Sequence, residues 1–297
     1  MQTVPAKTIV MKNKSTAWFG CEYNMNLYRG CNHGCLYCDS RSDCYHVENF
    51  DTVRAKQNAL RIVRDELARR AMPGVVATGA MSDPYNPFEA KEKLTRNALC
   101  LLDAYQYGAA IATKSDLITR DIDILKDIRA HSPVLCKITI TAFDDSLAKK
   151  LEPYAPPSSS RFEALRQLSA AGLFAGVLLM PVLPFIEDTP GNIEAIVRKA
   201  AACGARFVYP WFGMSMRSGQ REYFLQKLEE AFPGQGLARR YANAFGTRYN
   251  CPSPRQRQLW QLFASLCEQT GLLYKMQDII AGYRQGYANR QLSFLGQ

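Results

Sequence analysis

The sequence has no long apolar run. Its longest, at residues 173–183, is interrupted by Gly176 and Pro181, and it is far shorter than the roughly 20 apolar residues that cross a bilayer. The lysine-bearing residues 1–14 have no apolar segment followed by the small residues at which a secretory signal is cleaved. These two absences predict a cytoplasmic protein that does not enter a membrane.

The cysteines are not arranged as in a secreted disulfide framework. Of the ten, three lie within eight residues and seven are scattered singly. One close group indicates a metal site in a reducing compartment rather than a set of disulfides. Because there is no second close group, an auxiliary iron–sulfur centre is not expected.

Positive charge exceeds negative charge along the chain. The 37 lysines and arginines outnumber the 27 acidic residues, which gives a net charge of +10 and a pI near 9.1. Basic side chains bind polyanions by displacing counterions, so nucleic acid is one partner that this charge favours. Solvated helix faces explain the same charge equally simply.

Apolar strand-like runs alternate with amphipathic helical patterns over most of the 297 residues. The six strands are expected at 18–29, 74–80, 109–113, 134–141, 174–180 and 205–211, and the helices at 53–70, 93–106, 119–131, 160–171, 190–203 and 219–231. Thr189-Pro190 is a typical helix start. Repeated βα units predict an α/β fold with a parallel sheet, either doubly wound or a partial barrel.

The remaining segments define the expected organisation. Residues 153–160 are rich in proline and serine and are expected to form an exposed loop. From residue 234 onward the pattern is mainly helical. We therefore divide the chain into an N-terminal arm (1–16), a βα core (17–233) and a helical C-terminal extension (234–297).

The segment from Tyr28 to Cys38 is a loop that could enclose a metal centre. It contains three thiols and two glycines, namely Cys31, Cys35, Cys38, Gly30 and Gly34. Thiolates are soft ligands that select iron–sulfur clusters or zinc, and three of them can hold three corners of a cubane. The fourth iron would stay open for substrate. A zinc site completed by Cys44 or His46 is the alternative.

The spacing of these cysteines, with an aromatic residue before the last, strongly resembles the radical S-adenosylmethionine (SAM) superfamily. Four further stretches, in the expected order, make residues 17–210 similar to the spore photoproduct lyase family; they are residues 81–84, 112–114, 137–141 and 176–181. The resemblance implies a partial (β/α)6 TIM-like barrel with a mainly helical C-terminal extension. It also implies a [4Fe–4S] cluster and SAM at the carboxyl ends of the strands, as in other barrel enzymes.

The resemblance further implies which residues contact SAM. Ser82, Asp83, Lys114 and Thr139 would contact its methionyl and ribose groups, and Tyr37 would lie near the adenine. The implied reaction is reductive cleavage of SAM to a 5′-deoxyadenosyl radical that abstracts hydrogen from a substrate. The electron would come from a reductant such as flavodoxin or ferredoxin.

The sequence departs from the lyase pattern at one position. The lyases carry a cysteine two residues before the matching serine, where it returns a hydrogen atom to thymine, and this chain has Ala80. Repair of a thymine dimer is therefore in doubt. Cys44 and Cys136 are the candidate replacements, although a buried or inert thiol is the simpler interpretation of each.

Three hypotheses for function remain. The first is radical chemistry on a nucleic-acid base, since basic and aromatic residues are interleaved near the C-terminus as single-strand stacking requires; they are Arg239, Arg240, Arg248, Arg255, Arg257, Tyr241, Phe245, Tyr249 and Trp260. The second is the same chemistry on a small metabolite or peptide. The third is a zinc-stabilised nucleic-acid-binding protein without catalysis.

Overall fold

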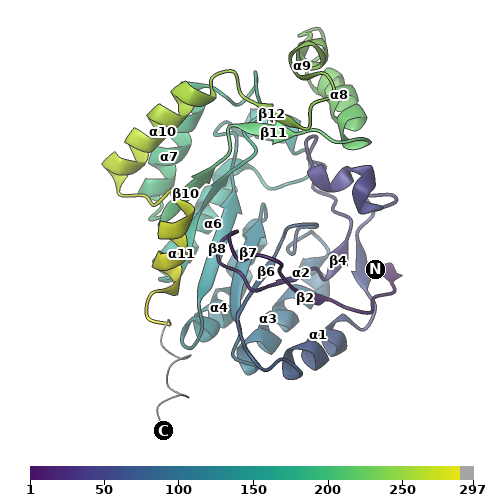
Figure 1. Cartoon of the computed structure of the whole chain (residues 1–297), viewed down its shortest axis with the longest axis vertical. Coiled ribbons are helices and arrows are strands. Elements are labelled where there is room, and N and C mark those ends of the chain that lie inside the picture. The colour runs from purple at the N-terminus through teal and green to yellow at the C-terminus, as the bar shows by residue number, and fades with distance from the viewer. Residues whose placement is uncertain (288–297) are drawn as a thin grey trace.

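Seven strands form the main sheet of the computed structural model, which describes residues 1–287 (Figure 1). Their order is β10 (Phe207–Pro210), β9 (Phe174–Leu179), β8 (Val134–Thr139), β7 (Gly108–Thr113), β6 (Val75–Thr78), β3 (Tyr23–Met25) and β2 (Val10–Lys12). Neighbours from β10 to β3 are parallel, and β2 is antiparallel at one edge.

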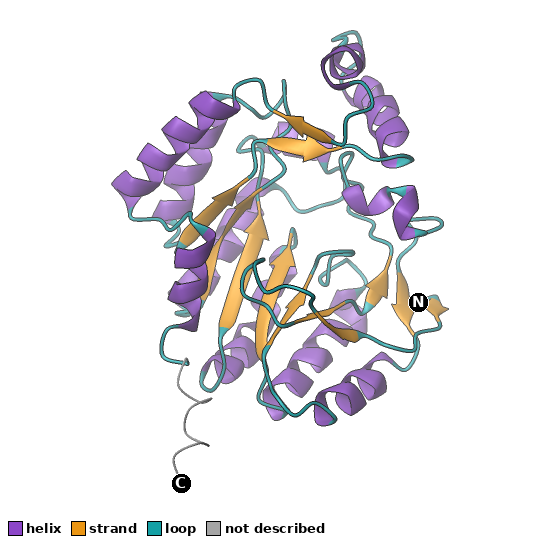
Figure 2. Ribbon diagram, viewed as in Figure 1, coloured by secondary structure: helices purple, strands orange, loops and turns teal. Residues whose placement is uncertain are grey.

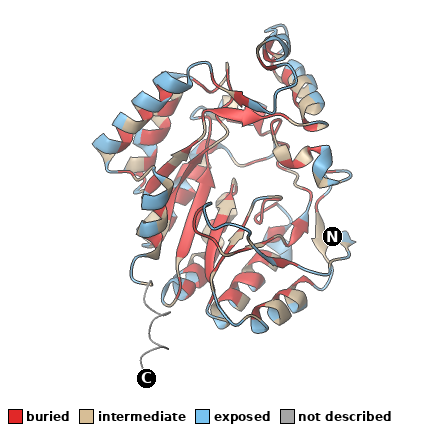
Figure 3. Cartoon of the chain, viewed as in Figure 1, coloured by how far each residue is buried: buried red, intermediate tan, exposed pale blue. Residues whose placement is uncertain are grey.

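Helices cover one face of this sheet (Figure 2). They are α1 (Ala59–Ala68), α3 (Leu94–Ala104), α4 (Ile122–Arg129), α6 (Ser158–Ala170) and α7 (Pro190–Ala202). Between sheet and helices lies the main apolar core, to which the strands contribute Ile111, Ile138 and Val177, and the sheet is accordingly largely buried (Figure 3). Because β10 and β2 do not pair, the sheet is open, and the predicted partial barrel is confirmed.

The opposite, concave face is covered in part by α11 (Met276–Arg284), which lies across β8 (Figure 1). Ile279 and Tyr283 of this helix pack with Leu135 and Phe207 of the strands. The turn at residues 16–20 packs there too, since Phe19 is fully buried and its carbonyl accepts a hydrogen bond from the Tyr283 hydroxyl at 2.7 Å.

The expected first strand, 18–29, is wrong in extent. Residues 16–20 form a turn in which Gly20 N donates to Thr16 O at 2.9 Å, and only β3 and β4 (Tyr28–Arg29) are extended. β4 leaves the main sheet and pairs with β5 (Arg54–Lys56), whose other neighbour is β1 (Thr3–Val4). β5 also explains why the helix expected from residue 53 begins only at Ala59.

Helix starts follow the sequence more closely. The Thr189 hydroxyl accepts from Asn192 N and Pro190 occupies the first turn of α7, as predicted. A helix not predicted, α5 (Asp145–Leu151), is capped by Asp144. The loop expected at 153–160 is shorter than predicted, because α6 already begins at the buried Ser158. Its exposure is mixed: Tyr154 and Pro157 are exposed, whereas Ala155 is buried.

The C-terminal elements belong to the same body as the sheet. α8 (Gln220–Ala231) packs on α9 (Leu237–Phe245), β11 (Gly213–Ser215) pairs with β12 (Asn250–Pro252), and α10 (Gln256–Thr270) lies against α7. The expected boundary at 233 thus falls between two helices in contact, and the expected arm contains β1 and β2. The three-part division stays a prediction. No helix within residues 1–287 is long and apolar enough to cross a membrane.

We predict that Ile279→Ala will lower the free energy of unfolding by about 2–5 kcal/mol. Ile279 is fully buried between α11 and the concave face, so removing its side chain leaves a cavity there. Urea unfolding measures the change. Gln277→Ala, on the exposed side of the same helix, is the matched control. Similar values for the two variants would mean that α11 does not contribute its expected packing.

Candidate functional site

The cysteine loop follows β4 and reaches the carboxyl ends of the parallel strands. It is anchored there by hydrogen bonds of its backbone: Cys31 N donates to Phe50 O and Leu36 N to Leu151 O, both at 2.9 Å, and His33 O accepts from Tyr154 N at 3.0 Å. His33 Nδ1 also lies 3.4 Å from Asp83 Oδ2, just beyond the end of β6. The loop is therefore held on both sides by the barrel.

Two glycines make this path sterically possible. Gly30 and Gly34 have φ values of +82° and +71°, which side chains disfavour. A Cβ on Gly30 would lie 2.6 Å from the carbonyl oxygens of Phe50 and Thr52, and one on Gly34 would lie 2.7 Å from the ring of Tyr154. The backbone can approach these neighbours only because no side chain intervenes.

The three thiols are close enough to influence one another. Burial raises the pKa of Cys31 to about 12, and Asp83 and Cys38 add to this rise. Burial also raises the pKa of Cys35 and Cys38, which the nearby Lys114 ammonium opposes. Metal binding would displace the three protons, as for other buried thiolates. Lys114 would then face a group of anionic sulfurs.

These thiols do not converge on one point. Within residues 1–287, no group of three histidine, cysteine or acidic side chains is arranged to hold a single ion. Three thiolates are the donor set that an iron–sulfur cubane takes, one cysteine to each of three irons. The cluster on these cysteines and the zinc site with Cys44 or His46 both stay predictions.

Asp83 joins two parts of the site. Its Oδ1 accepts from the Thr113 hydroxyl at 2.6 Å and from Tyr85 N at 2.9 Å, and its Oδ2 accepts from Lys114 N at 2.8 Å. The carboxylate thus aligns the end of β7 with the turn after β6. The predicted contact of Asp83 with SAM stays a prediction, but its oxygens already have partners in this chain.

Glu152 is the centre of a buried charge network that the sequence did not reveal. It is 2% exposed and pairs with Arg161 of α6 at 2.5 Å and with Lys114 at 3.8 Å, and it accepts a hydrogen bond from the Tyr37 hydroxyl. Burial acts to raise the pKa of Glu152, but Arg161 and Lys114 outweigh it and lower that pKa. A single glutamate before a proline-rich segment gives no sequence signal for this role.

The other predicted SAM contacts lie at neighbouring strand ends. Lys114 directly follows β7, its Nζ is 5.4 Å from the centre of the Tyr37 ring, and Thr139 is the last residue of β8. Ser82 is buried and its hydroxyl donates to Tyr28 O at 3.1 Å. Lys114 and Tyr37 are therefore close together. Ser82 follows β6 and Thr139 ends β8, which are the strands on either side of β7.

Glu187, which the sequence also did not indicate, is a second buried carboxyl group nearby. It is fully buried; Oε2 accepts from Leu183 N at 2.9 Å, whereas Oε1 has no hydrogen-bond partner. Burial raises its pKa to about 8. The group is consequently mainly protonated at pH 7, unlike Glu152.

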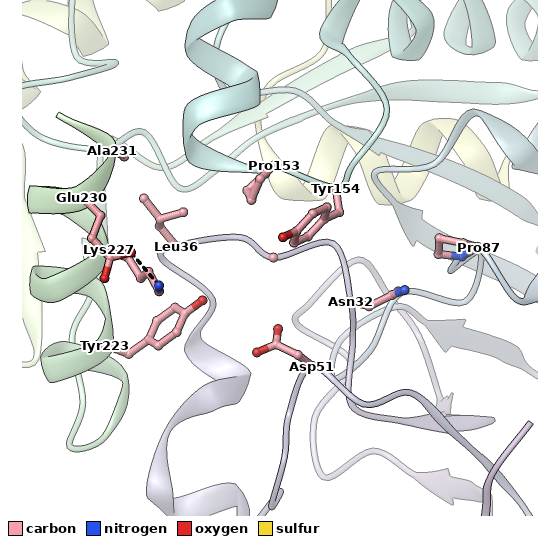
Figure 4. Close-up of a pocket in the computed structure, with 11 residues that line it drawn as sticks. Asn32, Leu36, Asp51, Pro87, Pro153, Tyr154, Tyr223, Lys227, Glu230 and Ala231 are labelled. Atoms are coloured by element: carbon pink, nitrogen blue, oxygen red, sulfur yellow. Dashed lines mark hydrogen bonds and ion pairs between the residues drawn. The ribbon is translucent and has the colours of Figure 1, made fainter.

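The cysteine loop also borders a surface cleft of about 860 Å³ (Figure 4). Asn32, Gly34 and Leu36 supply one wall, and Tyr154, Tyr223 and Lys227 lie around it. Solvent therefore reaches the outer side of the loop, even though the cysteine side chains themselves are largely enclosed.

The candidate hydrogen-donor thiols lie in different surroundings. Cys136 is fully buried in the core between the sheet and the helices, on the opposite face of β8 from Thr139. Cys44 is exposed, and its sulfur accepts from Arg217 at 3.4 Å. Cys136 therefore does not face the interior of the barrel. It cannot stand in there for the lyase cysteine that Ala80 replaces.

The proposed stacking surface near the C-terminus is smaller than the sequence suggested. Tyr241 and Phe245 are buried against α8 and the cysteine loop. Only Tyr249 and Trp260, 53% and 45% exposed, remain at the surface. The interleaved pattern arose from the amphipathic face of α9, which turns its apolar side inward.

The fold and the site together define the class of protein. It is a partial α/β barrel that carries a three-cysteine loop at the carboxyl ends of its strands. The model of the radical SAM superfamily matches residues 25–200. The chain belongs to the radical SAM superfamily, which implies a [4Fe–4S] cluster and SAM.

The chain is similar in sequence to curated relatives and shares its fold with solved structures. An uncharacterized protein of Mycobacterium tuberculosis is 30% identical over 77% of this chain and 69% of its own length. One of Methanocaldococcus jannaschii is 28% identical over 72% and 79%. Spore photoproduct lyase complexed with dinucleoside spore photoproduct shares the fold with a TM-score of 0.63 and 15% identity, covering 88% of this chain and 76% of the lyase. A radical SAM methyltransferase from Kitasatospora setae shares it with a TM-score of 0.54 and 11% identity, over 82% and 51%.

We predict that Glu152→Gln will lower the free energy of unfolding by about 3–5 kcal/mol, because it leaves the Arg161 charge buried without a partner. Urea unfolding at pH 7 measures the loss. The matched control is Glu163→Gln, whose partner Arg166 is exposed on the same helix; it should leave stability unchanged. A stable Glu152→Gln variant would show that the network is not required.

We predict that the stability of the protein will depend on Glu187 between pH 4.5 and 8. The unfolded carboxyl ionises near its usual 4.5, whereas the folded one stays protonated to about 8. Unfolding in this window releases a proton, so the free energy of unfolding falls as pH rises, by up to about 1.4 kcal/mol per pH unit.

Glu187→Gln should remove this slope, since a neutral amide replaces the titrating group. Urea unfolding at a series of pH values measures the slope, and Glu229→Gln on the exposed side of α8 is the control. An unchanged slope in Glu187→Gln would contradict the raised pKa.

Proposed function

We propose that the chain is a radical SAM enzyme that holds a [4Fe–4S] cluster with Cys31, Cys35 and Cys38 and binds SAM beside it. The observation that carries this proposal is the three-cysteine loop facing Lys114 at the strand ends. When bound, the cluster and SAM supply one-electron cleavage of SAM to methionine and a 5′-deoxyadenosyl radical, which abstracts hydrogen from the substrate.

Lys114 is the residue we assign to the SAM carboxylate. A lysine ammonium pairs with a carboxylate as a point charge. Burial disfavours the charge of Lys114, but Cys35 and Glu152 raise its pKa, so the side chain stays protonated. Asp83 positions the residue by accepting the Lys114 N–H and the Thr113 hydroxyl.

The neighbouring polar side chains complete the proposed SAM site. Ser82 and Thr139 would contact the methionyl and ribose groups, and Tyr37 would lie near the adenine, where its hydroxyl is already oriented by Glu152. Apolar side chains from α8 and α9 pack over Leu36 and Tyr37. This packing supports exclusion of water from a reactive intermediate.

A nucleic-acid base is the substrate that we propose first. The net charge of +10 supports it, as does the fold shared with a lyase complexed with a dinucleoside photoproduct. Because Ala80 stands where the lyases carry their hydrogen-donating cysteine, we expect a reaction that differs from the lyase reaction. A small metabolite or peptide is the second candidate, favoured by the burial of Tyr241 and Phe245, which reduces the stacking surface. We propose that a reductant such as flavodoxin or ferredoxin supplies the electron from the side of the cleft.

Anaerobic reconstitution tests this proposal. We expect about four irons per chain and 5′-deoxyadenosine after addition of SAM and a strong reductant. Alanine at Cys31, Cys35 or Cys38 should abolish both, because each thiolate binds a different iron. Iron and sulfide analysis and chromatography of the nucleoside products are the measurements.

Cys100→Ala is the matched control, because Cys100 is a lone exposed cysteine on α3. It should keep the cluster and the product. Zinc without iron, or a cluster that never cleaves SAM, would refute the enzyme and favour a metal-stabilised binding protein.

A further inference from the structure

Lys137 occupies the middle of β8, on the concave face of the sheet. Two residues before Thr139 on the same strand, it points to the same side. Its partners in register are Ala112 of β7 and Gly176 of β9. Both neighbours are small, and the lysine therefore has room to lie along the concave face.

The ammonium group of Lys137 has no partner of opposite charge. The side chain is 3% exposed, and its Nζ lies 4.6 Å from the centre of the Phe19 ring. Within residues 1–287 it makes neither a hydrogen bond nor an ion pair, and the titratable groups that affect it are the Cys21 and Cys136 thiols. Burial lowers the pKa of Lys137 accordingly.

An unpaired lysine in this position costs stability. Burying an ammonium group without a counterion is unfavourable, and contact with one phenyl ring recovers only part of that cost. A leucine or methionine would pack against Phe19, Ala112 and Gly176 without the penalty. The residue is thus poorly explained by folding alone.

Several side chains near Lys137 on the concave face are only partly buried. Among the strand residues that face this side, Ala77, Ala112 and Tyr209 are partly exposed, as is Met180 directly after β9. Trp18, 50% exposed, packs edge-on against Tyr209 with ring centres 5.5 Å apart. Ala112 is the register neighbour of Lys137, and the side chains that surround the lysine on this face are otherwise apolar and aromatic.

Lys137 and Lys114 are chemically distinct. Lys114 is paired with Glu152 and lies beside the cysteine loop. Lys137 lies two residues before the end of β8 that we assign to SAM, and no acidic residue in the described part of the chain compensates it. A ligand that carries a negative charge would supply the partner that these residues do not.

We propose that Lys137 binds an acidic group of the substrate, a carboxylate or a phosphate, inside the barrel. This inference rests on the proposed function, because it places the substrate below SAM on the concave face. The aromatic side chains of Trp18 and Tyr209 suit a planar group next to the acidic one. The charged group would replace the counterion that the protein does not supply.

Calorimetric titration of the reconstituted, SAM-bound protein tests the inference, with benzoate and phenyl phosphate as probes. Wild type should bind at least one of them, and Lys137→Met should weaken that binding about tenfold or more, as expected for a lost charge-assisted hydrogen bond. Lys137→Arg keeps the charge and should retain most of the affinity. Lys126→Met, an exposed lysine on α4, should bind as wild type does. Preference for phenyl phosphate indicates a phosphorylated substrate, and preference for benzoate a carboxylate.

Thermal unfolding gives a second readout that does not require a ligand. Lys137→Met should melt at the same temperature as wild type or about 2–4 °C higher, because it removes an uncompensated buried charge. A structural lysine would instead give a lower melting temperature. The inference is overturned if Lys137→Met melts below wild type, if wild type binds neither probe, or if both proteins bind equally. Wild type and Lys137→Met should both form deoxyadenosine from SAM without substrate. If they do, any of these outcomes counts against the Lys137 inference and not against the radical SAM proposal.

Discussion

The ion pair between Glu152 and Arg161 is the interaction on which the candidate site depends. A buried carboxylate is tolerated only when charges and hydrogen bonds compensate it. Here the compensation comes from α6 through Arg161, from the end of β7 through Lys114, and from the cysteine loop through Tyr37. One carboxylate thus connects three segments of the chain, and the loop cannot move away from the strand ends without breaking the Tyr37 hydrogen bond to this buried group.

The rest of the site is built around this network by apolar packing. Leu36 and Tyr37 pack with Met214 and with Phe224 of α8, so the C-terminal helices cover the part of the cysteine loop that does not face the surface cleft. At the other end of the barrel, α11 and the turn at residues 16–20 cover the concave face. Segments near both ends of the chain therefore delimit the interior in which the chemistry would occur.

Within that interior, the two lysines differ in how they are compensated. Lys114 has an anionic partner and stays charged, while Lys137 has none among residues 1–287 and is buried against a phenyl ring. Two cations at successive depths suit two acidic groups, one on SAM and one on a second molecule. The mainly protonated Glu187 adds little opposing charge at pH 7. The charge inside the barrel thus depends on which ionisable side chains have a partner of opposite charge.

The sequence by itself determined the βα order and the cysteine loop. Strand and helix periodicity are local properties, and the spacing of Cys31, Cys35 and Cys38 is read directly from the chain. The tertiary structure was needed to show that residues 16–20 turn across the concave face, that Tyr241 is buried, and that Glu152 pairs with Lys114. These features depend on contacts between residues far apart in sequence, and no local pattern encodes a partner on another strand. The role of Lys137 has the same origin, since a lysine within a strand looks ordinary until its neighbours show that it lacks a counterion.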